Sequence, residues 1–377
     1  MNALITGAKG FIGRNLVSRL RAQGGCYLRL FDLGSAASEL REALSQADIV
    51  YHLAGVNRPQ DPEEFAAVNT GLTRDICDIL RGQGRTPRIV LSSSTQAAIE
   101  NSYGVSKRKA EEALEAFAAE TGAVVRIYRL ANVFGKWSRP NYNSVVASFC
   151  HNIANDLPIA ISDHSRKVEL VYIDDVVDAF VAELTGENGA VPKLPTCMIT
   201  LGDLAGRIQA LHEMHTSLLA PDFSIRFNQQ LFATFLSYVP DECRRQQLHI
   251  RADERGCFAE FIKSPHFGQI SISKTKPGVT RGNHYHHTKT EKFFVVQGEG
   301  IIRMRHIEGS RVTEYRVCGA GFQVIDIPPG FTHSIENVGS GELVTLFWAS
   351  EIFEPDRPDT YHMPVLPPAE AGERVTA

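Results

Sequence analysis

Four residues near the end of the sequence have types and spacing that suit metal binding. His284 and His286 are separated by one residue within 282–300, GNHYHHTKTEKFFVVQGEG, so in a strand both imidazoles lie on one face. Glu291 follows after a turn, and His333 lies in PPGFTHSIEN, where a Pro-Gly turn would return a strand to the same interior. Three imidazoles and one carboxylate predict a divalent-metal site, with Zn²⁺ as first candidate and iron, manganese or nickel as alternatives.

Tyr103 and Lys107 form a second reactive group, in the stretch SYGVSK at the start of a helical run. Their spacing of four places both side chains on one helix face. An ammonium close to a phenol favours the phenolate, so the tyrosine can exchange a proton with an alcohol at neutral pH. Ser94, at the end of RIVLSSS, can supply a hydroxyl that polarises a carbonyl oxygen. The group predicts proton transfer at a carbonyl or alcohol carbon.

The opening LITGAKGFIG predicts a nucleotide-binding turn. Gly7, Gly10 and Gly13 follow a short apolar run and precede an amphipathic stretch, which is the order strand, glycine turn, helix. Backbone without a Cβ can approach a pyrophosphate, and the helix N-terminus offers free N–H groups to its charge. Asp32 ends the next strand and would bind the ribose hydroxyls of NAD, whereas Lys9 favours the 2′-phosphate of NADP. These two residues leave NADP(H) and NAD(H) both open.

The elements that must position these residues change character along the chain. Apolar runs such as YLRLFD, DIVYHLAG and RIVLSSS alternate with helical segments in the first two thirds, which predicts a doubly wound parallel sheet. Beyond about residue 240 come short alternating strands with Gly and Pro turns, typical of a sandwich or barrel. A length of 377 residues also favours two domains. We expect domains at 1–243 and 244–368, and a disordered tail at 369–377.

The first two thirds resemble the extended short-chain dehydrogenase/reductases, through TGAKGFIG, HLAG, AAVNTG, SSS, YGVSK, RLANVFG and VYIDDVVDAF. This resemblance implies a Rossmann-like fold, activity on nucleotide sugars, and catalysis by Ser94, Tyr103 and Lys107. Thr95 and Gln96 replace the acidic pair of the 4,6-dehydratases, and the gap between serine and tyrosine is short, so a simple keto reductase fits better. The cofactor contacts that follow are Gly7, Lys9, Gly10, Phe11, Ile12, Gly13, Asp32, Leu53, Ala54, Gly55, Asn69, Ser92, Tyr103, Lys107, Leu130 and Val133, with Asn132 and Ser94 on the sugar nucleotide.

The last third resembles the cupins, because the two histidine-containing stretches match both cupin motifs. It also resembles the deoxysugar 3,5-epimerase cupins in DERGCFAEF and VTRGNHYH. In those epimerases the histidine matching His284 is the base, and a lysine matching Lys292 stabilises an enolate without metal. The full ligand set here assigns His284 to metal binding and leaves the base open, with Lys292 as a catalytic candidate.

Nearly the whole chain resembles the CapF-type capsular polysaccharide enzymes, particularly in LAGVNRP, FGKWSRPNYNSV, GNHYHHTKTEKF and FEPDRPDTY. The resemblance implies that the cupin epimerises C3 of UDP-2-acetamido-2,6-dideoxy-hexos-4-ulose. The reductase then reduces C4 with NADPH to give UDP-2-acetamido-2,6-dideoxy-L-talose, on the route to UDP-N-acetyl-L-fucosamine. Arg139 and Asn141, in FGKWSRPNYNSV, are the further expected substrate contacts.

Three alternatives stay open. The cupin could be a metal-dependent oxygenase, or a non-catalytic dimerisation or sugar-sensing module beside a working reductase. A nucleotide-binding regulator without enzymatic activity would have no need for Ser94, Tyr103 and Lys107 together.

Composition narrows the partners. A formal net charge of -4 gives no electrostatic footprint for nucleic acid or an anionic membrane, so we expect small molecules or other proteins as partners. The resemblance to the CapF-type enzymes implies a UDP-linked 4-keto amino sugar. Seven cysteines without CxxC spacing, together with the lack of a signal peptide, favour a reducing compartment, and we expect a cytoplasmic protein. No apolar run is long enough to span a bilayer. We also expect a homodimer through the cupin domain.

Overall fold

The computed structural model describes residues 1–57, 61, 64–186 and 189–366, and the predicted tail at 369–377 lies outside them. The chain folds into two compact units. The first comprises Met1–His212 and Arg226–Asp241, and the second comprises Glu213–Ile225 and the residues from Glu242 onward. Segment 213–225, which the sequence placed in the first domain, therefore packs with the second unit.

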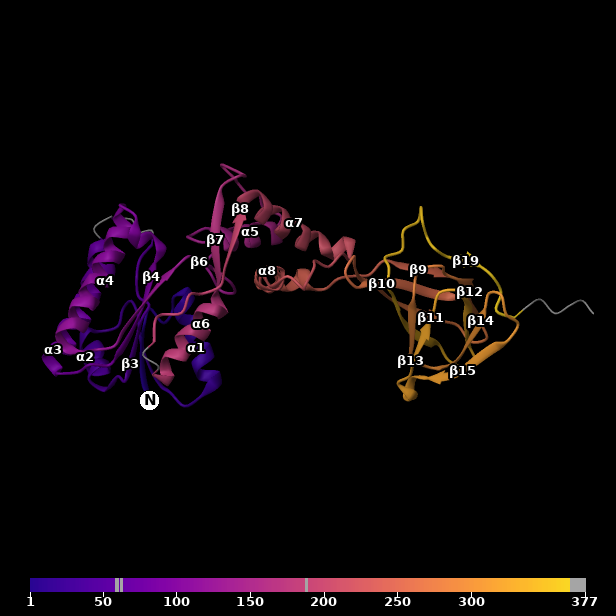
Figure 1. Cartoon of the computed structure of the whole chain (residues 1–377), viewed down its shortest axis with the longest axis horizontal. Helices are drawn as coiled ribbons and strands as arrows, with labels where there is room; N and C mark the ends of the chain where they lie inside the picture. Colours follow the sequence, from indigo (N-terminus) through magenta and orange to yellow (C-terminus); the bar gives the residue numbers. More distant parts are fainter. Residues whose placement is uncertain (58–60, 62–63, 187–188, 367–377) are drawn as a thin grey trace, which may run out of the picture. The chain divides into compact units, whose positions relative to one another are not determined.

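A five-stranded parallel sheet with the order β2-β1-β3-β4-β5 forms the centre of the first unit. Its strands are fully or largely apolar because helices cover both faces; all four residues of β3 are buried. Helices α1 and α6 pack on one face, and α2, α3 and α4 on the other (Figure 1). The predicted doubly wound sheet is confirmed. Its strands are β1 (Asn2–Thr6), β2 (Tyr27–Phe31), β3 (Ile49–His52), β4 (Arg88–Ser94) and β5 (Val125–Leu130).

The helices of this unit follow the strands in the order that a parallel sheet requires. A π-helix, η1 (Phe65–Gly71), leads directly into α3. The helices are α1 (Phe11–Gln23), α2 (Ala37–Gln46), α3 (Leu72–Gln83), α4 (Ser102–Thr121), α5 (Val145–Ala154), α6 (Ile173–Ala182), α7 (Leu201–Ser217) and α8 (Arg226–Leu236).

A smaller sheet, β6 (Asn132–Phe134), β7 (Lys167–Tyr172) and β8 (Thr196–Thr200), completes the first unit and has its own core with α5, α7 and α8. The apolar run VVRIYRLANVFG is divided between the two sheets: β5 ends at Leu130, and β6 belongs to the second sheet.

Two antiparallel sheets form the second unit, in the orders β16-β13-β18-β11-β10-β9 and β15-β14-β17-β12-β19. Buried residues from both enclose one apolar core, so the predicted all-β barrel is confirmed. The strands are β9 (Ile250–Asp253), β10 (Gly256–Ser264), β11 (Gly268–Thr275), β12 (Thr280–Tyr285), β13 (Glu291–Gln297), β14 (Glu299–His306), β15 (Val312–Cys318), β16 (Val324–Ile327), β17 (Phe331–Asn337), β18 (Leu343–Ala349) and β19 (Tyr361–His362).

No helix within the described ranges is long and apolar enough to cross a membrane.

Candidate functional sites

The glycine turn lies where the strand order of the first sheet reverses. β2 and β3 flank β1 on opposite sides, and ligands of open α/β sheets bind beyond the carboxyl ends of the strands at such a point. Gly7 has φ +68°, and a Cβ there would lie 2.7 Å from the backbone nitrogen of Ala54. The backbone of the turn after β1 therefore packs directly against the backbone after β3. No side chain at Gly7 occupies the space where a phosphate group would approach the turn.

Asp32 and Lys9, the residues expected to select the coenzyme, lie together at the end of β2. The Lys9 backbone N–H donates to Oδ2 of Asp32 at 2.5 Å, and the N–H of Leu33 donates to Oδ1 at 2.8 Å. Asp32 thus holds the glycine turn through its carboxylate. Phe11 and Ile12, at the start of α1, are partly buried against the apolar core.

Asn69 lies in the π-helix and connects three segments of the predicted cofactor site. Its Oδ1 accepts the Val56 N–H at 2.9 Å, and its Nδ2 donates to the Val56 carbonyl at 3.1 Å and to Oγ of Ser106 at 3.0 Å. The side-chain amide is buried, and both its oxygen and its nitrogen form hydrogen bonds within the protein. Asn69 therefore fixes the backbone beyond Gly55.

The predicted proton-transfer residues come together at the end of β4 and the start of α4. Nζ of Lys107 donates to the Ser92 carbonyl at 2.9 Å, which anchors the helix to the strand. Burial of the ammonium lowers the pKa of Lys107 to about 8, and Glu111, one turn further along α4, opposes that shift. Lys107 is thus a buried cation beside the strand that carries Ser94.

Burial raises the pKa of Tyr103, and a hydrogen bond with the Ser94 side chain acts in the opposite direction. The two hydroxyls are therefore neighbours, as the prediction requires. The Tyr103 ring packs against Phe65 of the π-helix, with ring centroids 5.8 Å apart. A protonated phenol beside a serine hydroxyl can donate to one developing oxyanion.

The remaining predicted contacts lie beyond β5 and around β6. Leu130 is buried and Val133 is partly buried against the same core as the glycine turn. Asn132 is exposed, and its Nδ2 donates to the Glu169 carbonyl at 3.0 Å. Arg139 is exposed and stacks over Tyr142, whereas Asn141 has φ +55° and its N–H donates to Oγ of Ser148 at 3.0 Å. No described contact joins Arg139 or Asn141 to Ser94, Tyr103 or Lys107.

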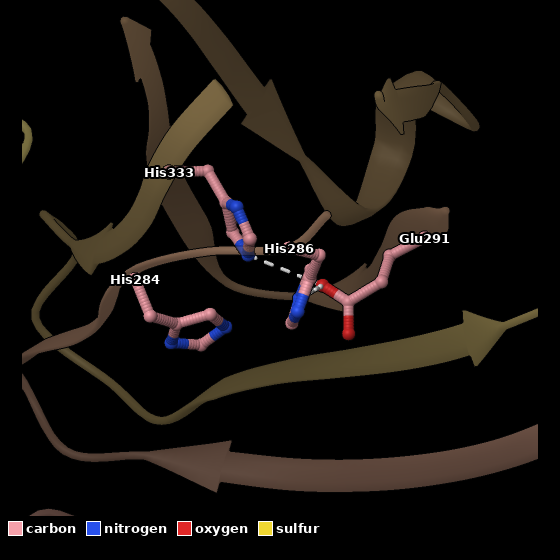
Figure 2. Close-up of side chains that lie close together, drawn as sticks. All are labelled: His284, His286, Glu291 and His333. Carbon is pink, nitrogen blue, oxygen red and sulfur yellow. Dashed lines mark ion pairs between the residues drawn. The ribbon is translucent and has the colours of Figure 1, made fainter. Parts of the chain in front are cut away.

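The structure brings the four predicted metal ligands together inside the barrel of the second unit. Their ligand atoms all lie within 4.8 Å of one another. Figure 2 shows the imidazoles of His284, His286 and His333 directed toward the Glu291 carboxylate. Oε2 of Glu291 is 3.3 Å from Nε2 of His286 and 3.1 Å from Nε2 of His333.

Hydrogen bonds on the outer side of two imidazoles fix their tautomers. Nδ1 of His286 lies 2.5 Å from the Asp359 carbonyl, and Nδ1 of His333 lies 3.3 Å from the Phe331 carbonyl. A carbonyl oxygen only accepts, so Nδ1 carries the proton in both rings and Nε2 presents its lone pair to the cluster. This is the arrangement of metal-binding histidines.

The buried polar atoms of this cluster fit a metal ion. Nε2 of His286, Nε2 of His333 and Oε2 of Glu291 are buried and have no hydrogen-bond partner, although such atoms are normally paired. Burial raises the pKa of Glu291, but the neighbouring imidazoles of His286 and His333 outweigh it, and the carboxylate is ionised. Burial also lowers the pKa of His284 to about 4, which keeps that imidazole neutral. Three imidazoles and a carboxylate suit Zn²⁺ and similar divalent ions.

Lys292 does not lie with this cluster. Successive residues of a strand point to opposite faces, so Lys292 faces away from Glu291, is 49% exposed and forms an ion pair with Asp326. This placement argues against the predicted catalytic role. The lysine that lines the cavity is Lys289, which is buried and donates from Nζ to the Pro358 carbonyl at 3.1 Å.

A cavity of about 370 Å³ opens beside the metal ligands. His284, His286 and Glu291 line one part of it, and Arg251, Arg255 and Arg281 line another. Nε and Nη2 of Arg281 are buried without a hydrogen-bond partner, so this guanidinium can accept a ligand anion.

Other residues that support the first site were not predicted. Nδ1 of His52 is 2.8 Å from Oγ1 of Thr6, and its Nε2 is 2.9 Å from Oγ1 of Thr73, which donates to the Asn69 carbonyl at 2.8 Å. Burial lowers the pKa of His52 to about 3, so the ring is a neutral bridge between β1 and α3. Its place in HLAG was visible in the sequence, but its partners were not.

Similarity to known proteins agrees with both sites. Residues 3–194 match the NAD dependent epimerase/dehydratase family, and residues 251–361 match the polysaccharide biosynthesis C-terminal domain. A UDP-2-acetamido-2,6-beta-L-arabino-hexul-4-ose reductase of Pseudomonas aeruginosa is 42% identical over 364 residues, which cover 96% of this chain and 98% of that protein.

Solved structures are also similar to this chain. The crystal structure of the capsular polysaccharide assembling protein CapF from Staphylococcus aureus is 42% identical, has a TM-score of 0.90, and matches 97% of this chain and 100% of that one. A UDP-glucose 4-epimerase of Thermotoga maritima is 20% identical, has a TM-score of 0.53, and covers 63% of this chain and 98% of that one; it shares the fold alone. The resemblance expected from the sequence is confirmed: the chain belongs to the NAD-dependent epimerase/dehydratase family and is, over nearly its whole length, a CapF-like protein.

Proposed function

We propose that the second unit epimerises C3 of UDP-2-acetamido-2,6-dideoxy-hexos-4-ulose and that the first unit reduces C4 of the product. The final product is UDP-2-acetamido-2,6-dideoxy-L-talose, on the route to UDP-N-acetyl-L-fucosamine. The observation that carries this proposal is the presence of both sites in one chain: the Ser94–Tyr103–Lys107 group and the buried His/Glu cluster. Similarity to a reductase named for a UDP-linked 4-keto sugar supports the substrate class.

The chemistry of the substrate dictates the order. The C3 proton is acidic only while C4 is a ketone, because the carbanion then delocalises onto the carbonyl oxygen. Reduction of C4 removes that acidity and fixes the new stereocentre. Epimerisation therefore precedes reduction.

In the reductase, residues of α4 and β4 transfer one proton to the substrate. Tyr103 donates it to the C4 oxygen, Ser94 hydrogen-bonds the same oxygen, and Lys107 holds positive charge beside them. Gly7, Gly10 and Gly13 would hold NADPH at the glycine turn, and the coenzyme would supply the hydride. Lys9 supports NADPH over NADH, and the ratio of kcat/KM for the two coenzymes tests this choice. Asn132, Arg139 and Asn141 are proposed sugar-nucleotide contacts.

In the epimerase, His284, His286, Glu291 and His333 would hold a divalent metal, for which we propose Zn²⁺. The metal would supply Lewis acidity for the negative charge that develops on the C4 oxygen. Arg281 is placed to bind the diphosphate of the substrate, because its Nε and Nη2 lack hydrogen-bond partners in the same cavity, although Nη2 lies 3.7 Å from Oδ1 of Asp253. We further propose that the boundary between the two domains lies near residue 243, with segment 213–225 belonging to the second domain, and that the second domain forms a homodimer.

Deuterium incorporation separates the two activities. A Tyr103→Phe variant is incubated with the keto sugar nucleotide in deuterated water, and the C3 position is followed by NMR and mass spectrometry. We expect deuterium at C3 without oxidation of NADPH, because the barrel does not need the phenol. Absence of deuterium would contradict independent epimerisation.

The converse variant tests the metal cluster. In His284→Ala/Glu291→Ala, NADPH oxidation should continue while the C3 configuration of the product changes. Product of unchanged configuration would instead favour a barrel that serves only in dimerisation or sensing.

A further inference from the structure

The segment between two of the proposed metal ligands is a short loop with its own anion-binding geometry. Residues 287–290 join His286 to the start of β13 at Glu291, and the first three of them form this loop. Three consecutive backbone N–H groups, those of His287, Thr288 and Lys289, point toward one carboxylate. Successive N–H groups aimed at one point form a concave anion site.

Asp359 supplies that carboxylate from a distant part of the chain. Its Oδ1 accepts the His287 N–H at 2.9 Å, and its Oδ2 accepts the N–H groups of Thr288 at 3.0 Å and Lys289 at 2.9 Å. Oγ1 of Thr288 also donates to Oδ2 at 3.0 Å. A single side chain therefore binds the loop four times.

The backbone of the same residue contacts a proposed ligand directly. The Asp359 carbonyl accepts from Nδ1 of His286 at 2.5 Å, which holds the ring with Nε2 directed toward the cluster. Asp359 has φ +40°, a backbone conformation that a residue with a side chain adopts only when its surroundings hold it there. One residue thus orients the ligand ring and fixes the loop that carries the ligand.

Neighbouring contacts hold Asp359 in place. Nζ of Lys289 donates to the Pro358 carbonyl at 3.1 Å and to Oγ1 of Thr360 at 3.3 Å. β19 follows immediately and pairs with β12, where His284 lies opposite His362. The stretch FEPDRPDTY is therefore a strap across the ligand loop.

We propose that Asp359 is a positioning residue for the metal centre, which preorganises His286 and the 287–289 loop for metal binding. This inference rests on the proposed metal site. Outer hydrogen-bond partners of metal ligands typically change metal affinity by about 10- to 100-fold when they are replaced. Asp359 binds more of the loop than a partner to one imidazole would, because its carboxylate also satisfies three backbone donors.

The experiment measures Zn²⁺ affinity of the full chain by competition with a chromogenic chelator. Asp359→Asn keeps the shape of the side chain but replaces one acceptor oxygen with a donor that opposes the loop N–H groups. Asp356→Asn is the matched control, since Asp356 is exposed in the same strap and has no hydrogen bond or ion pair within the described part of the chain. The melting transition of the metal-free second unit reports that the barrel of each variant is folded.

We expect Zn²⁺ affinity to fall by about 10- to 100-fold in Asp359→Asn and by less than about twofold in Asp356→Asn. The metal-free melting temperature of Asp359→Asn should fall less than the zinc-saturated one. Equal affinity of Asp359→Asn and the unsubstituted chain, or equal losses of stability with and without zinc, would overturn the positioning role. Failure of the unsubstituted chain to bind Zn²⁺ would overturn the metal site itself and this inference with it.

Discussion

Burial, more than the proximity of charges, sets the proton chemistry at the scale of single residues. The sequence predicted that Lys107 would favour the phenolate of Tyr103, and the structure adds that burial acts on both groups. It lowers the pKa of Lys107 to about 8 and raises the pKa of Tyr103. In the absence of cofactor, Tyr103 is thus a protonated donor throughout the physiological range, and Lys107 is the group whose charge changes near it.

The pH dependence of reduction should reveal Lys107. Its folded pKa lies below the ordinary value of 10.5, so the ammonium is present below about pH 8 and is lost as the pH rises through that value. We expect kcat/KM for the keto sugar to fall above about pH 8. Lys107→Arg, whose guanidinium stays charged, should have a lower maximum but no fall until well above pH 8.

Lys109→Arg is the control for that profile, because Lys109 is exposed on the same helix. In Lys109→Arg, kcat/KM for the keto sugar should still fall near pH 8. An unchanged profile in Lys107→Arg would show that another group loses the proton.

At the scale of elements, a bulge in β12 determines how the metal ligands meet. The pairing of β12 with β17 shifts between Gly282 and His284, so that His284 comes to lie opposite His333. Gly282 has φ +93°, and a Cβ there would lie 2.7 Å from the His333 carbonyl oxygen. A β-bulge at a glycine changes the direction in which a nearby side chain points, and here that side chain is the proposed metal ligand His284.

Replacement of Gly282 should therefore damage both stability and metal binding. In Gly282→Ala the Cβ meets the backbone of β17, and the conformation itself disfavours a side chain, at a cost of about 1–3 kcal/mol. We expect the thermal midpoint of the second unit to fall by about 5 °C or more, and Zn²⁺ to bind more weakly. Calorimetry and chelator competition measure these effects.

Gly341→Ala is the matched control, because a Cβ at Gly341 would meet no atom within 4 Å and its φ is not positive. Gly341→Ala should change neither the thermal midpoint of the second unit nor its affinity for Zn²⁺. Equal behaviour of the two variants would mean that the bulge does not position His284.

Sequence patterns predicted the elements better than the contacts between them. Strand and helix periodicity gave the parallel sheet, the barrel and the ligand cluster, since each depends on spacing within short segments. Lys292 was assigned by resemblance, although the two-residue alternation from Glu291 places it on the outer face. Asp359 carries no local signal at all, because its partners are backbone N–H groups of a loop that only the folded barrel brings near it.

The whole molecule is built as two units with separate apolar cores. The three buried clusters of the first unit share no residue with the cluster of the second. Helix α7 begins in the first unit and ends in the second. Helical periodicity cannot tell which core a residue will join, and for that reason the sequence did not assign 213–225 to the second unit.

Metal removal should act on one unit only. The ligands and their outer partners all belong to the second unit, whereas the glycine turn and Tyr103 belong to the first. We expect scanning calorimetry with a chelator to lower the transition of the second unit, and added NADPH to raise that of the first, because a ligand stabilises the fold that binds it. Chelation that also abolished NADPH binding would contradict this independence.

The strap has a consequence for biosynthesis. Domains generally fold in the order in which the ribosome makes them, so the first unit can gain most of its structure while the barrel is still incomplete. The proposed metal ligands lie between His284 and His333, yet the loop between two of them is fixed by Asp359 and its neighbours Pro358 and Thr360, which are made later. Zinc that meets the growing chain early would find ligands that are not yet held in place. A stop codon before Asp359 would leave the first unit intact but would remove the residue that fixes the loop of the proposed metal site.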